Sequence, residues 1–414
     1  MAPRRRNGKT SRLDLSTPRI LTKLFLAVLL AGYAAAQTVP AEPDRFIPPR
    51  PVAPIAPLPE GSWRFIVSGD SRNCGDIVMP AIAAHSTRFA PSFYWHLGDL
   101  RAIYAIDEDI AFASASESHS PSCQTYQRLA WDDFAVNQIA AFGDTPFYLG
   151  IGNHEVIAPK DKDAFLRQFG DWLDQPVLRQ QRVQDKEPAQ PEPYFHWIQG
   201  GVDFIYLDNA SGFFADAQLQ WLQHRLDSAK SNAAVKSVVA GMHEALPDSL
   251  ANGHSMGDGT GGPNARPSGE KAYKALATFH DETNKPVYVL ASHSHFFMEN
   301  IFASPQLTQN DAKPLPGWIV GTAGAVRLVL PKEAPPMSKT DVYGYLLGTV
   351  SAGGTIQFTY EEIYKSDVPQ YVWQRYPAKA VLWCFEHNSQ NKDPNGPDLT
   401  QRCQTPQGAS GHAH

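Results

Sequence analysis

The sequence feature that most limits how this chain can fold is a set of five short apolar runs, each ending at a side chain able to bind a metal ion. These side chains are Asp70, Asp99, Asn153, His243 and His293. Apolar runs of this length, rich in aromatic and β-branched residues, are typical of buried strands. Predicted helices lie between them, which favours an α/β fold built in layers. Open α/β sheets keep their chemistry at the carboxyl ends of strands, so the five side chains are candidates for one site.

The third run shows the pattern in its most specific form. The apolar and aromatic residues 145–151 lead directly into Gly152-Asn153-His154-Glu155. The Asn153 side chain offers a neutral oxygen ligand, and His154 is of the one residue type that titrates near neutral pH without perturbation. Taken alone, these four residues would be interpreted as a turn with an Asx cap. Their weight comes from the four other runs that are built in the same way.

The chemistry of these strand ends favours a centre with two metal ions. Carboxylate and amide oxygens together with imidazoles suit Zn, Mn or Fe. Two ions held about 3.5–4 Å apart need a bridging group, and Asp99 can bridge. The two imidazoles of His293-Ser294-His295 lie on alternate sides of an extended chain, so they can serve different ions. A single histidine is more often an interior residue with its hydrogen bonds satisfied than a metal ligand. Five strand ends of this type, however, would be an unlikely coincidence.

The globular part is expected to form one large domain over residues 62–365, in which segment 175–193 is a surface excursion. A strand pair is predicted at 194–197 and 202–207, with its turn at Gly200-Gly201. Helices are predicted at 76–88, 125–142, 161–173, 215–230 and 270–283. Closing antiparallel strands are predicted at 318–321, 343–347 and 355–360.

Both ends of the chain are expected to lie outside this domain. Residues 1–36 combine a basic start, an apolar run at 24–30 and the small residues Ala34-Ala35-Ala36, which predicts a signal peptide; the alternative is an uncleaved anchor. The run is shorter than the roughly 20 residues of a membrane span, so we expect a periplasmic or secreted protein without a stable span. Residues 37–61 are a proline-rich linker. Residues 366–414 are a partly disordered extension, including a functionless tail with His412 and His414.

Removal of the signal segment makes the charge balance strongly acidic. The whole chain has 36 Lys and Arg and 42 Asp and Glu, and the first 36 residues contain seven of the basic and one of the acidic residues. The remainder therefore has 29 basic and 41 acidic residues, a net charge of −12. No nucleic-acid partner is expected, because a chain this acidic gains little from a phosphate backbone. An anionic substrate would need local positive charge from metal ions or placed arginines.

The sequence contains four cysteines, an even number that favours disulfides in an exported protein. Three pairings are open. We prefer Cys74 with Cys123, which would join the loop after Arg101 to the end of the first strand. The second pair would then be Cys384 with Cys403, which would fix the tail.

Taken in order, five blocks resemble those of the calcineurin-like metallophosphoesterases. They are Asp70, Gly98-Asp99, Gly152-Asn153-His154-Glu155, His243 and His293-Ser294-His295. The resemblance covers residues 65–296, with similar closing strands to about 364. It implies a four-layer α/β/β/α sandwich with two metal ions at the strand ends. By this resemblance Asp99, Asn153, His243 and His293 hold one ion, and Asp70, Asp99 and His295 hold the other.

The same resemblance implies an exported phosphoesterase that acts on a phosphorylated small molecule or ester. A metal-bound hydroxide would attack phosphorus, and His154 would act near the leaving oxygen. For His154 the alternative is a hydrogen bond that holds its loop. The alternative functions are a phosphodiesterase or nucleotidase on the same site, or a non-catalytic binding protein with a weak first metal site. The long loops 102–122 and 249–268 are expected to set the substrate; the oligomeric state stays open.

The first block departs from the family pattern. Much of the family has Asp-x-His there, whereas this chain has Arg72 in the third position. The purple acid phosphatase branch also lacks that histidine but has a tyrosine three residues after the bridging aspartate; this position is Ala102, and Tyr104 follows two residues later. The first ion therefore has one ligand fewer than expected, unless Tyr104, Asn73 or water supplies it.

Arg72 cannot itself bind a metal, because guanidinium stays protonated and has no lone pair to give. We expect it to turn away from the ions and to bind the substrate phosphate in a planar, bidentate manner. Arg101, two residues after the bridging Asp99, could bind phosphate in the same way. The alternative for Arg72 is a simple ion pair with a carboxylate such as Asp76.

Overall fold

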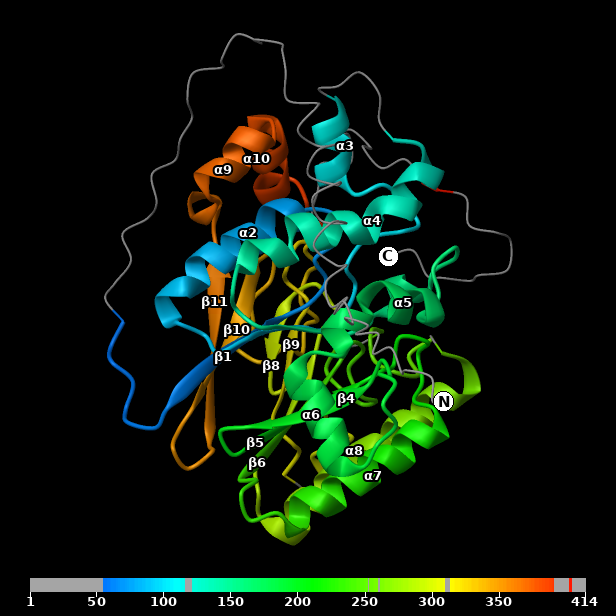
Figure 1. The fold of residues 1–414 in the computed structure, drawn as a ribbon, viewed down its shortest axis with the longest axis vertical. Coiled ribbons are helices and arrows are strands. Elements are labelled where there is room, and N and C mark those ends of the chain that lie inside the picture. Colours follow the sequence, from blue (N-terminus) through cyan, green and yellow to red (C-terminus); the bar gives the residue numbers. More distant parts are fainter. Residues whose placement is uncertain are drawn as a thin grey trace, which may run out of the picture. The chain divides into compact units, whose positions relative to one another are not determined.

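A computed structural model describes residues 55–115, 121–251, 253–259, 261–309, 313–390 and 402–403 of the 414. The predicted signal peptide, most of the proline-rich linker and the histidines of the tail lie outside these residues. The described residues form two β-sheets with helices on their outer faces (Figure 1). Within the part of the chain described, no helix is both long and apolar enough to cross a membrane.

The first sheet has the strand order β11-β10-β1-β2-β3. Its central strands β1 (Trp63–Ser68), β2 (Tyr94–His96) and β3 (Phe147–Leu149) run parallel. The closing strands β10 (Tyr343–Val350) and β11 (Ile356–Ile363) extend it antiparallel. Both short parallel strands β2 and β3 are fully buried, as expected for runs that are apolar on both faces.

The second sheet has the strand order β4-β5-β6-β7-β9-β8. Four of its strands are parallel to one another: β5 (Val202–Leu207), β6 (Ser237–Met242), β7 (Val287–Ala291) and β9 (Gly317–Val320). Antiparallel edge strands close it, namely β4 (Phe195–Gln199) and β8 (Phe297–Glu299).

The two sheets pack against each other through a core of aromatic rings. Phe93 next to β2 makes edge contacts with Trp197 of β4 and Phe204 of β5, at ring-centre distances of 5.4 and 5.2 Å. Phe65 of β1 contacts the same Phe204 at 5.0 Å. Such tilted pairs are the favoured geometry for aromatic side chains and add to the area that they bury. The sheets therefore form the two inner layers of the molecule.

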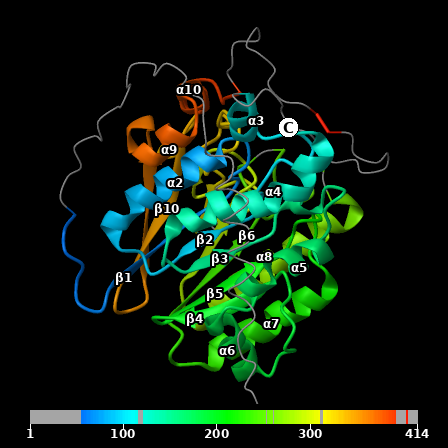
Figure 2. The same ribbon diagram turned by 45° about the horizontal axis from the view of Figure 1, so that its top comes forward.

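Helices cover the outer faces of both sheets (Figure 2). The first sheet is covered by α2 (Gly75–Ser86) and α4 (Cys123–Asn137), and the second by α7 (Asp216–Ser231) and α8 (Ala265–Thr283). Of the remaining helices, α5 (Lys162–Leu173) contacts β3, α6 (Pro176–Asp185) contacts β4, and α3 (Glu108–Ala115) contacts α2. The predicted α/β/β/α order of layers is confirmed.

The hairpin between β4 and β5 illustrates how local sequence sets local structure. Its two turn residues, Gly200 and Gly201, both have positive φ, at 55° and 83°. A tight hairpin turn that follows the twist of the strands needs this left-handed backbone, which glycine adopts without cost. The predicted strand pair and its turn are confirmed.

Segment 175–193 differs from the predicted surface excursion, because its first half is the helix α6. Pro176 begins this helix, where its missing N–H costs nothing. Leu178 is buried, and Arg182 is buried as well while it donates to the Leu173 carbonyl at 3.0 Å. A charged side chain that packs its stem inward is not visible as an apolar stripe in the sequence.

Beyond Lys365 the chain continues into the same core. Two helices, α9 (Gln370–Arg375) and α10 (Ala378–Glu386), lie beside α2 in Figure 1. Val372 and Val381 are buried with the main apolar cluster. This part of the predicted extension therefore belongs structurally to the globular unit.

The two disulfides are paired differently from the predicted connections. Cys74 is bonded to Cys384 and Cys123 to Cys403, with Cα–Cα distances of 5.8 and 5.3 Å. The prediction was wrong because it joined cysteines that are neighbours in sequence. The C-terminal helices return to α2, and residues 402–403 return to the loop after β2, where the Cys403 N–H donates to the Tyr104 carbonyl at 2.8 Å. Each bridge thus fixes the end of the chain to the first sheet.

Candidate metal centre

The carboxyl ends of the parallel strands of both sheets lie at one edge, and the candidate ligands stand on the residues that follow. Asp70, Asp99 and His293 have φ values of 59°, 60° and 64°. This left-handed conformation is unfavourable for residues with a side chain and persists only where the surrounding structure holds it. Three such residues at one edge indicate a built site.

Two glycines allow these strand ends to approach each other closely. A side-chain carbon on Gly152 would lie 2.3 Å from Asp99 Oδ1, and one on Gly98 would lie 2.5 Å from the Gly152 backbone nitrogen. No side chain fits at either position. The glycines that precede Asp99 and Asn153 in the sequence motifs are therefore required by the packing of one loop on the other.

Four of the candidate ligand atoms converge at what we call the Asn153 site, formed by Asp99, Asn153, His243 and His293. His243 Nε2 lies 2.8 Å from Asn153 Oδ1, 3.2 Å from His293 Nδ1 and 3.3 Å from Asp99 Oδ1. His293 Nδ1 lies 3.1 Å from the same Asn153 oxygen. Tetrahedral ligands bound at about 2.1 Å stand roughly 3.4 Å apart. The residues of the Asn153 site therefore fit a divalent ion.

The surroundings of His243 prepare its ring for metal binding. His243 Nδ1 donates to the Leu97 carbonyl at 3.1 Å, so Nε2 is the nitrogen that faces Asn153. Burial lowers the pKa of His243, but the carboxylates of Asp99 and Asp70 outweigh it and raise the pKa to about 10. The negative potential that favours a proton at this position also favours a cation.

The remaining candidates form what we call the Arg72 site, made of Asp70, Asp99, His295, Arg72 and Tyr104. His295 Nδ1 donates to the Val326 carbonyl at 2.8 Å, so its Nε2 faces the site, 3.3 Å from Asp70 Oδ1. Arg72 Nη2 donates to this His295 Nε2 at 3.1 Å, and Arg72 Nε lies 3.8 Å from Asp99 Oδ2. Arg72 Nη1 donates to the Tyr104 hydroxyl at 3.2 Å.

Both predicted arrangements of Arg72 differ from the observed one. Its guanidinium does not turn away from the candidate ligands but lies among them. It makes no ion pair with Asp76, which is held by Arg101 instead. Asn73, a candidate replacement ligand, also points elsewhere: its amide donates to Glu108 at 2.8 Å. The candidate that does reach the site is Tyr104.

Neighbouring polar groups hold the carboxylates of the centre in the ionised form. Asp70 Oδ2 accepts hydrogen bonds from Ser292 Oγ at 2.6 Å and from the His293 N–H at 2.7 Å. Burial raises the pKa of Asp70, but the contact with His295 and the nearby His243 lower it to about 2. Asp70 Oδ1 and Asp99 Oδ2 are buried without a hydrogen-bond partner among the residues described. Buried, ionised oxygens without a hydrogen bond favour a cation nearby.

Glu155, the last residue of the third block, acts as the anchor of this edge. Its buried carboxylate accepts the N–H groups of Gly152 at 2.8 Å, Asp99 at 2.8 Å and Leu100 at 3.0 Å. Burial and the charge of Asp99 raise the pKa of Glu155 to about 8. The sequence indicated no role for this residue, although its position three after Gly152 is that of a capping box at the start of a helical turn.

His154 lies beside Asp99 rather than among the ligands of the Asn153 site. Its Nδ1 donates to the Ala102 carbonyl at 2.7 Å, and its Nε2 lies 3.5 Å from Asp99 Oδ2. Burial and the positive charge of Arg72 lower the pKa of His154 to about 4. The tautomer fixed by Ala102 therefore directs Nε2 towards the centre.

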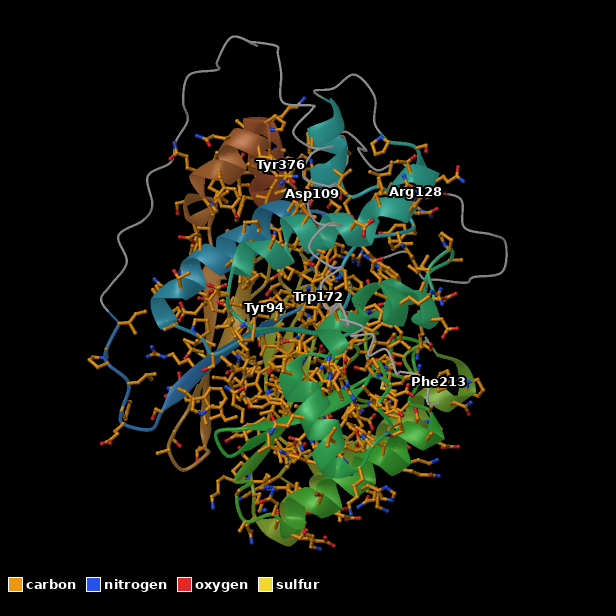
Figure 3. All side chains as sticks on the ribbon, viewed as in Figure 1. Tyr94, Asp109, Arg128, Trp172, Phe213 and Tyr376 are labelled. Atoms are coloured by element: carbon orange, nitrogen blue, oxygen red, sulfur yellow. A yellow bond between two sulfur atoms is a disulfide. The ribbon has the colours of Figure 1, made fainter. Side chains whose placement is uncertain are left out.

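Arg101 is not at the centre, and its predicted role in binding substrate was wrong. Its guanidinium is completely buried in what we call the carboxylate cluster. The four acidic members of this cluster are Asp76, Asp107, Asp109 and Asp133. Asp109 and Tyr376, whose hydroxyl donates to Asp76 at 2.8 Å, are labelled in Figure 3 near α2 and the C-terminal helices. Because Arg101 is itself completely buried and held by four carboxylates, it cannot contact a substrate.

An apolar cavity of about 510 Å³ adjoins the centre. His254 from the loop after β6 lines it, and the His254 ring lies 5.7 Å from the ring of His293. Val326, whose carbonyl holds His295, lines it as well, together with Phe296 and Leu328. His254, a residue that the motifs did not reveal, thus brings loop 249–268 to the metal centre, and the role of this loop in setting the substrate stays a prediction.

A second group of possible ligands, Asp185, Glu187 and His196, lies away from this edge. Arg225 already neutralises it, at 2.8 Å from Asp185 and 3.5 Å from Glu187. His196 donates to Asp203 at 2.8 Å as well as to Asp185 at 2.7 Å. We interpret this group as an ion-pair network that joins α6, β4 and α7.

No protein-family model and no curated protein matches this sequence. Among solved structures the chain is similar to a purple acid phosphatase from yellow lupin (Lupinus luteus) seeds, at 13% identity and a TM-score of 0.48, covering 73% of this chain and 52% of that one. The chain thus spans about half the length of the lupin enzyme.

Two further solved structures are similar at comparable identity. PhoD matches at 15% identity and a TM-score of 0.45, over 74% of this chain and 70% of that one. A metallophosphoesterase from Sphaerobacter thermophilus matches at 11% identity and a TM-score of 0.28, over 77% of this chain and 97% of that one.

Proposed function

We propose that this protein is an exported metal-dependent phosphoesterase. The observation that carries the proposal is the convergence of Asp99 Oδ1, Asn153 Oδ1, His243 Nε2 and His293 Nδ1 at one strand edge. Asn153 and His293 are partly exposed, whereas the other ligands are buried. A substrate can therefore reach an ion held here from the side of these two residues.

A divalent ion at the Asn153 site would supply Lewis acidity towards a phosphoryl oxygen and would activate water near neutral pH. The residues of the chain do the remaining work. Glu155 holds the Asp99 loop in place, and Ala102 orients the His154 ring. We assign His154 to the ester oxygen that leaves: its Nε2 carries no proton while Nδ1 donates to Ala102, so it would take a proton from the attacking water and pass that proton to the leaving oxygen.

Export is proposed on two grounds. The first 36 residues have the pattern of a signal peptide. The four cysteines, all of which lie outside that segment, are joined in two disulfides, as is typical of proteins in oxidising compartments. We therefore expect the mature protein in the periplasm or outside the cell.

The apolar cavity favours a substrate whose alcohol part carries an apolar group. Apart from His254 and Gln390 its lining is apolar, and among the residues described no Lys or Arg lines it to bind a second phosphate. A phosphomonoester of an apolar alcohol therefore fits better than a nucleotide. A diesterase remains the second candidate, because the cavity also has room for a second ester group.

The test is a reconstitution assay on purified protein. Chelator-treated protein is supplied with Mn, Zn or Fe and assayed with p-nitrophenyl phosphate and with bis(p-nitrophenyl) phosphate. We expect turnover only with metal, and faster with the monoester. His243→Ala should lose bound metal and turnover together, whereas the control His224→Ala, on the exposed face of α7, should keep both.

The outcomes separate the competing functions. Faster turnover of the diester would replace the monoesterase by a diesterase. Bound metal without turnover on either substrate would favour a binding protein. Absence of metal binding under all conditions would contradict the proposed centre itself.

A further inference from the structure

Arg72 lies where the sequence places the ligands of a first metal ion. The three side-chain atoms assigned to that ion are Asp70 Oδ1, Asp99 Oδ2 and His295 Nε2. The His295 nitrogen accepts a hydrogen bond from Arg72 Nη2 at 3.1 Å, and the Asp99 oxygen lies 3.8 Å from Arg72 Nε. The lone pair of His295 that a metal would use is therefore directed at a guanidinium N–H.

The Arg72 side chain is held in this position from two sides. Tyr104 accepts from Nη1 at 3.2 Å, opposite the contact of Nη2 with His295. Only 4% of Arg72 is exposed. Tyr104 is itself fixed, because its carbonyl accepts the N–H of Cys403, whose disulfide with Cys123 joins the segment to α4. The guanidinium would need to leave a packed pocket to admit an ion.

The charge balance of the buried centre supports the same conclusion. Asp70 and Asp99 are its two carboxylates. Arg72 together with one divalent ion gives a net charge of about +1, which a bound phosphate ester can neutralise. A second divalent ion beside Arg72 would raise this to about +3 in a site with little access to water, where unpaired charge is costly.

We propose that the Arg72 guanidinium takes the place of one metal ion, so that the centre binds a single divalent ion at the Asn153 site. The inference rests on the proposed metal centre but goes beyond it, since it concerns the number of ions. It explains why this chain has neither the histidine of the first block nor a tyrosine at position 102: the position they would serve is filled by a fixed cation.

The test counts ions in the whole protein. Chelator-treated wild type is loaded with excess Mn²⁺, freed from unbound metal, and analysed for Mn per chain. We expect one ion per chain and the electron paramagnetic resonance spectrum of an isolated Mn²⁺. In Arg72→His, which restores the missing histidine of the first block, we expect two ions per chain and the spectrum of an exchange-coupled pair.

A matched control and a second variant make the result decisive. Arg88→His makes the same replacement at a half-buried arginine that pairs with Glu361 away from the centre, and it should still bind one ion. Arg72→Met removes the cation without adding a ligand and should bind a second ion only at high Mn²⁺. Thermal unfolding of each variant confirms that it is folded.

Each outcome has a distinct meaning. Two ions in the wild type would overturn the role of Arg72 and leave the proposed hydrolysis intact. Folded Arg72→His and Arg72→Met that both stay at one ion would also overturn it, because Arg72 would then not be what excludes the second ion. A wild type that binds no ion would instead contradict the proposed function.

Discussion

The Arg72 site and the carboxylate cluster each hold a buried arginine side chain, but the groups that surround the two guanidinium ions differ. Both arginines follow a parallel strand of the first sheet, both are buried, and both lie beside aspartates. Arg101 contacts four carboxylates, so its cluster has an excess of acidic groups, of which only Asp133 is partly exposed. Arg72 has one carboxylate at 3.8 Å and is otherwise bonded to neutral acceptors.

The difference shows what makes a buried arginine structural or functional. The acidic partners of Arg101 are satisfied by further donors, such as Tyr126 to Asp107 at 2.8 Å and Asn137 to Asp133 at 2.8 Å. At the Arg72 site, Asp70 Oδ1 and Asp99 Oδ2 accept no hydrogen bond from the residues described. A saturated cluster stabilises the fold, whereas an unsaturated one is left with capacity for a ligand.

The strongest test of this comparison removes one carboxylate from each region. Asp99→Asn should abolish metal binding and lower turnover by roughly 10⁴-fold, because the ion contributes several kcal/mol to the transition state. Asp76→Asn should leave the metal content unchanged and lower stability instead. Elemental analysis with p-nitrophenyl phosphate kinetics measures the first, and urea unfolding the second. Equal metal content in both variants would contradict the distinction.

Removal of the second arginine should affect folding rather than catalysis. Arg101→Met leaves four carboxylates without their shared cation, and we expect a loss of about 3–5 kcal/mol in the free energy of unfolding. The metal bound per folded chain should stay at the wild-type value. Arg101→Lys, which keeps the charge but not the planar fork, should lose less. A wild-type unfolding curve for Arg101→Met would show that the cluster does not stabilise the fold.

A variant of His154 tests whether this residue delivers a proton to the leaving oxygen. His154→Gln should lower turnover by roughly 10²-fold on an alkyl phosphate and much less on a nitrophenyl phosphate, whose phenolate leaves without a proton. Metal content and unfolding should not change, which separates this residue from Asp99 and from Arg101. An equal loss on both substrates would favour a role for His154 in holding the loop through its bond to Ala102.

The carboxylate cluster should make stability depend on pH. Burial and the charge of Asp76 raise the pKa of Asp133 to about 7 despite its contact with Arg101. The folded chain therefore holds this proton more tightly than the unfolded chain, so the stabilisation present below about pH 4 is lost as pH rises through about 7. In Asp133→Asn this part of the slope, on the order of 1 kcal/mol, should vanish. An unchanged slope in urea unfolding between about pH 5 and 8 would contradict the assignment.

The smallest expected effects come from replacing one tyrosine in each region. Tyr104→Phe removes the acceptor for Arg72 Nη1, and we expect turnover to change by less than about tenfold with unfolding unaltered. Tyr126→Phe leaves Asp107 without a donor and should lower the free energy of unfolding by about 1–2 kcal/mol at unchanged turnover. The reverse pattern would mean that the two regions had been assigned the wrong way round.

Much of the fold could be predicted because the sequence patterns that indicate it lie within short segments of the chain. The apolar runs became β1, β2, β3, β6 and β7, and the glycine pair became the turn between β4 and β5. The residues after those strands meet at one edge, as parallel strands require. Segment 175–193 was misjudged because the buried face of α6 includes an arginine stem. The disulfides were misjudged because sequence neighbours were preferred over partners brought by the C-terminal helices.

The sequence by itself determined the ligand types of the centre and their order, since each stands directly after its own strand. Only the tertiary structure decided which carboxylates lie next to Arg72 and which lie next to Arg101. Arg72 and Arg101 each lie a few residues after a strand of the first sheet, and both were predicted to bind phosphate. The chain brings Asp107, Asp109 and Asp133 around Arg101, and His295 and Tyr104 around Arg72. These partners lie up to 223 residues apart in sequence, so no local pattern records them.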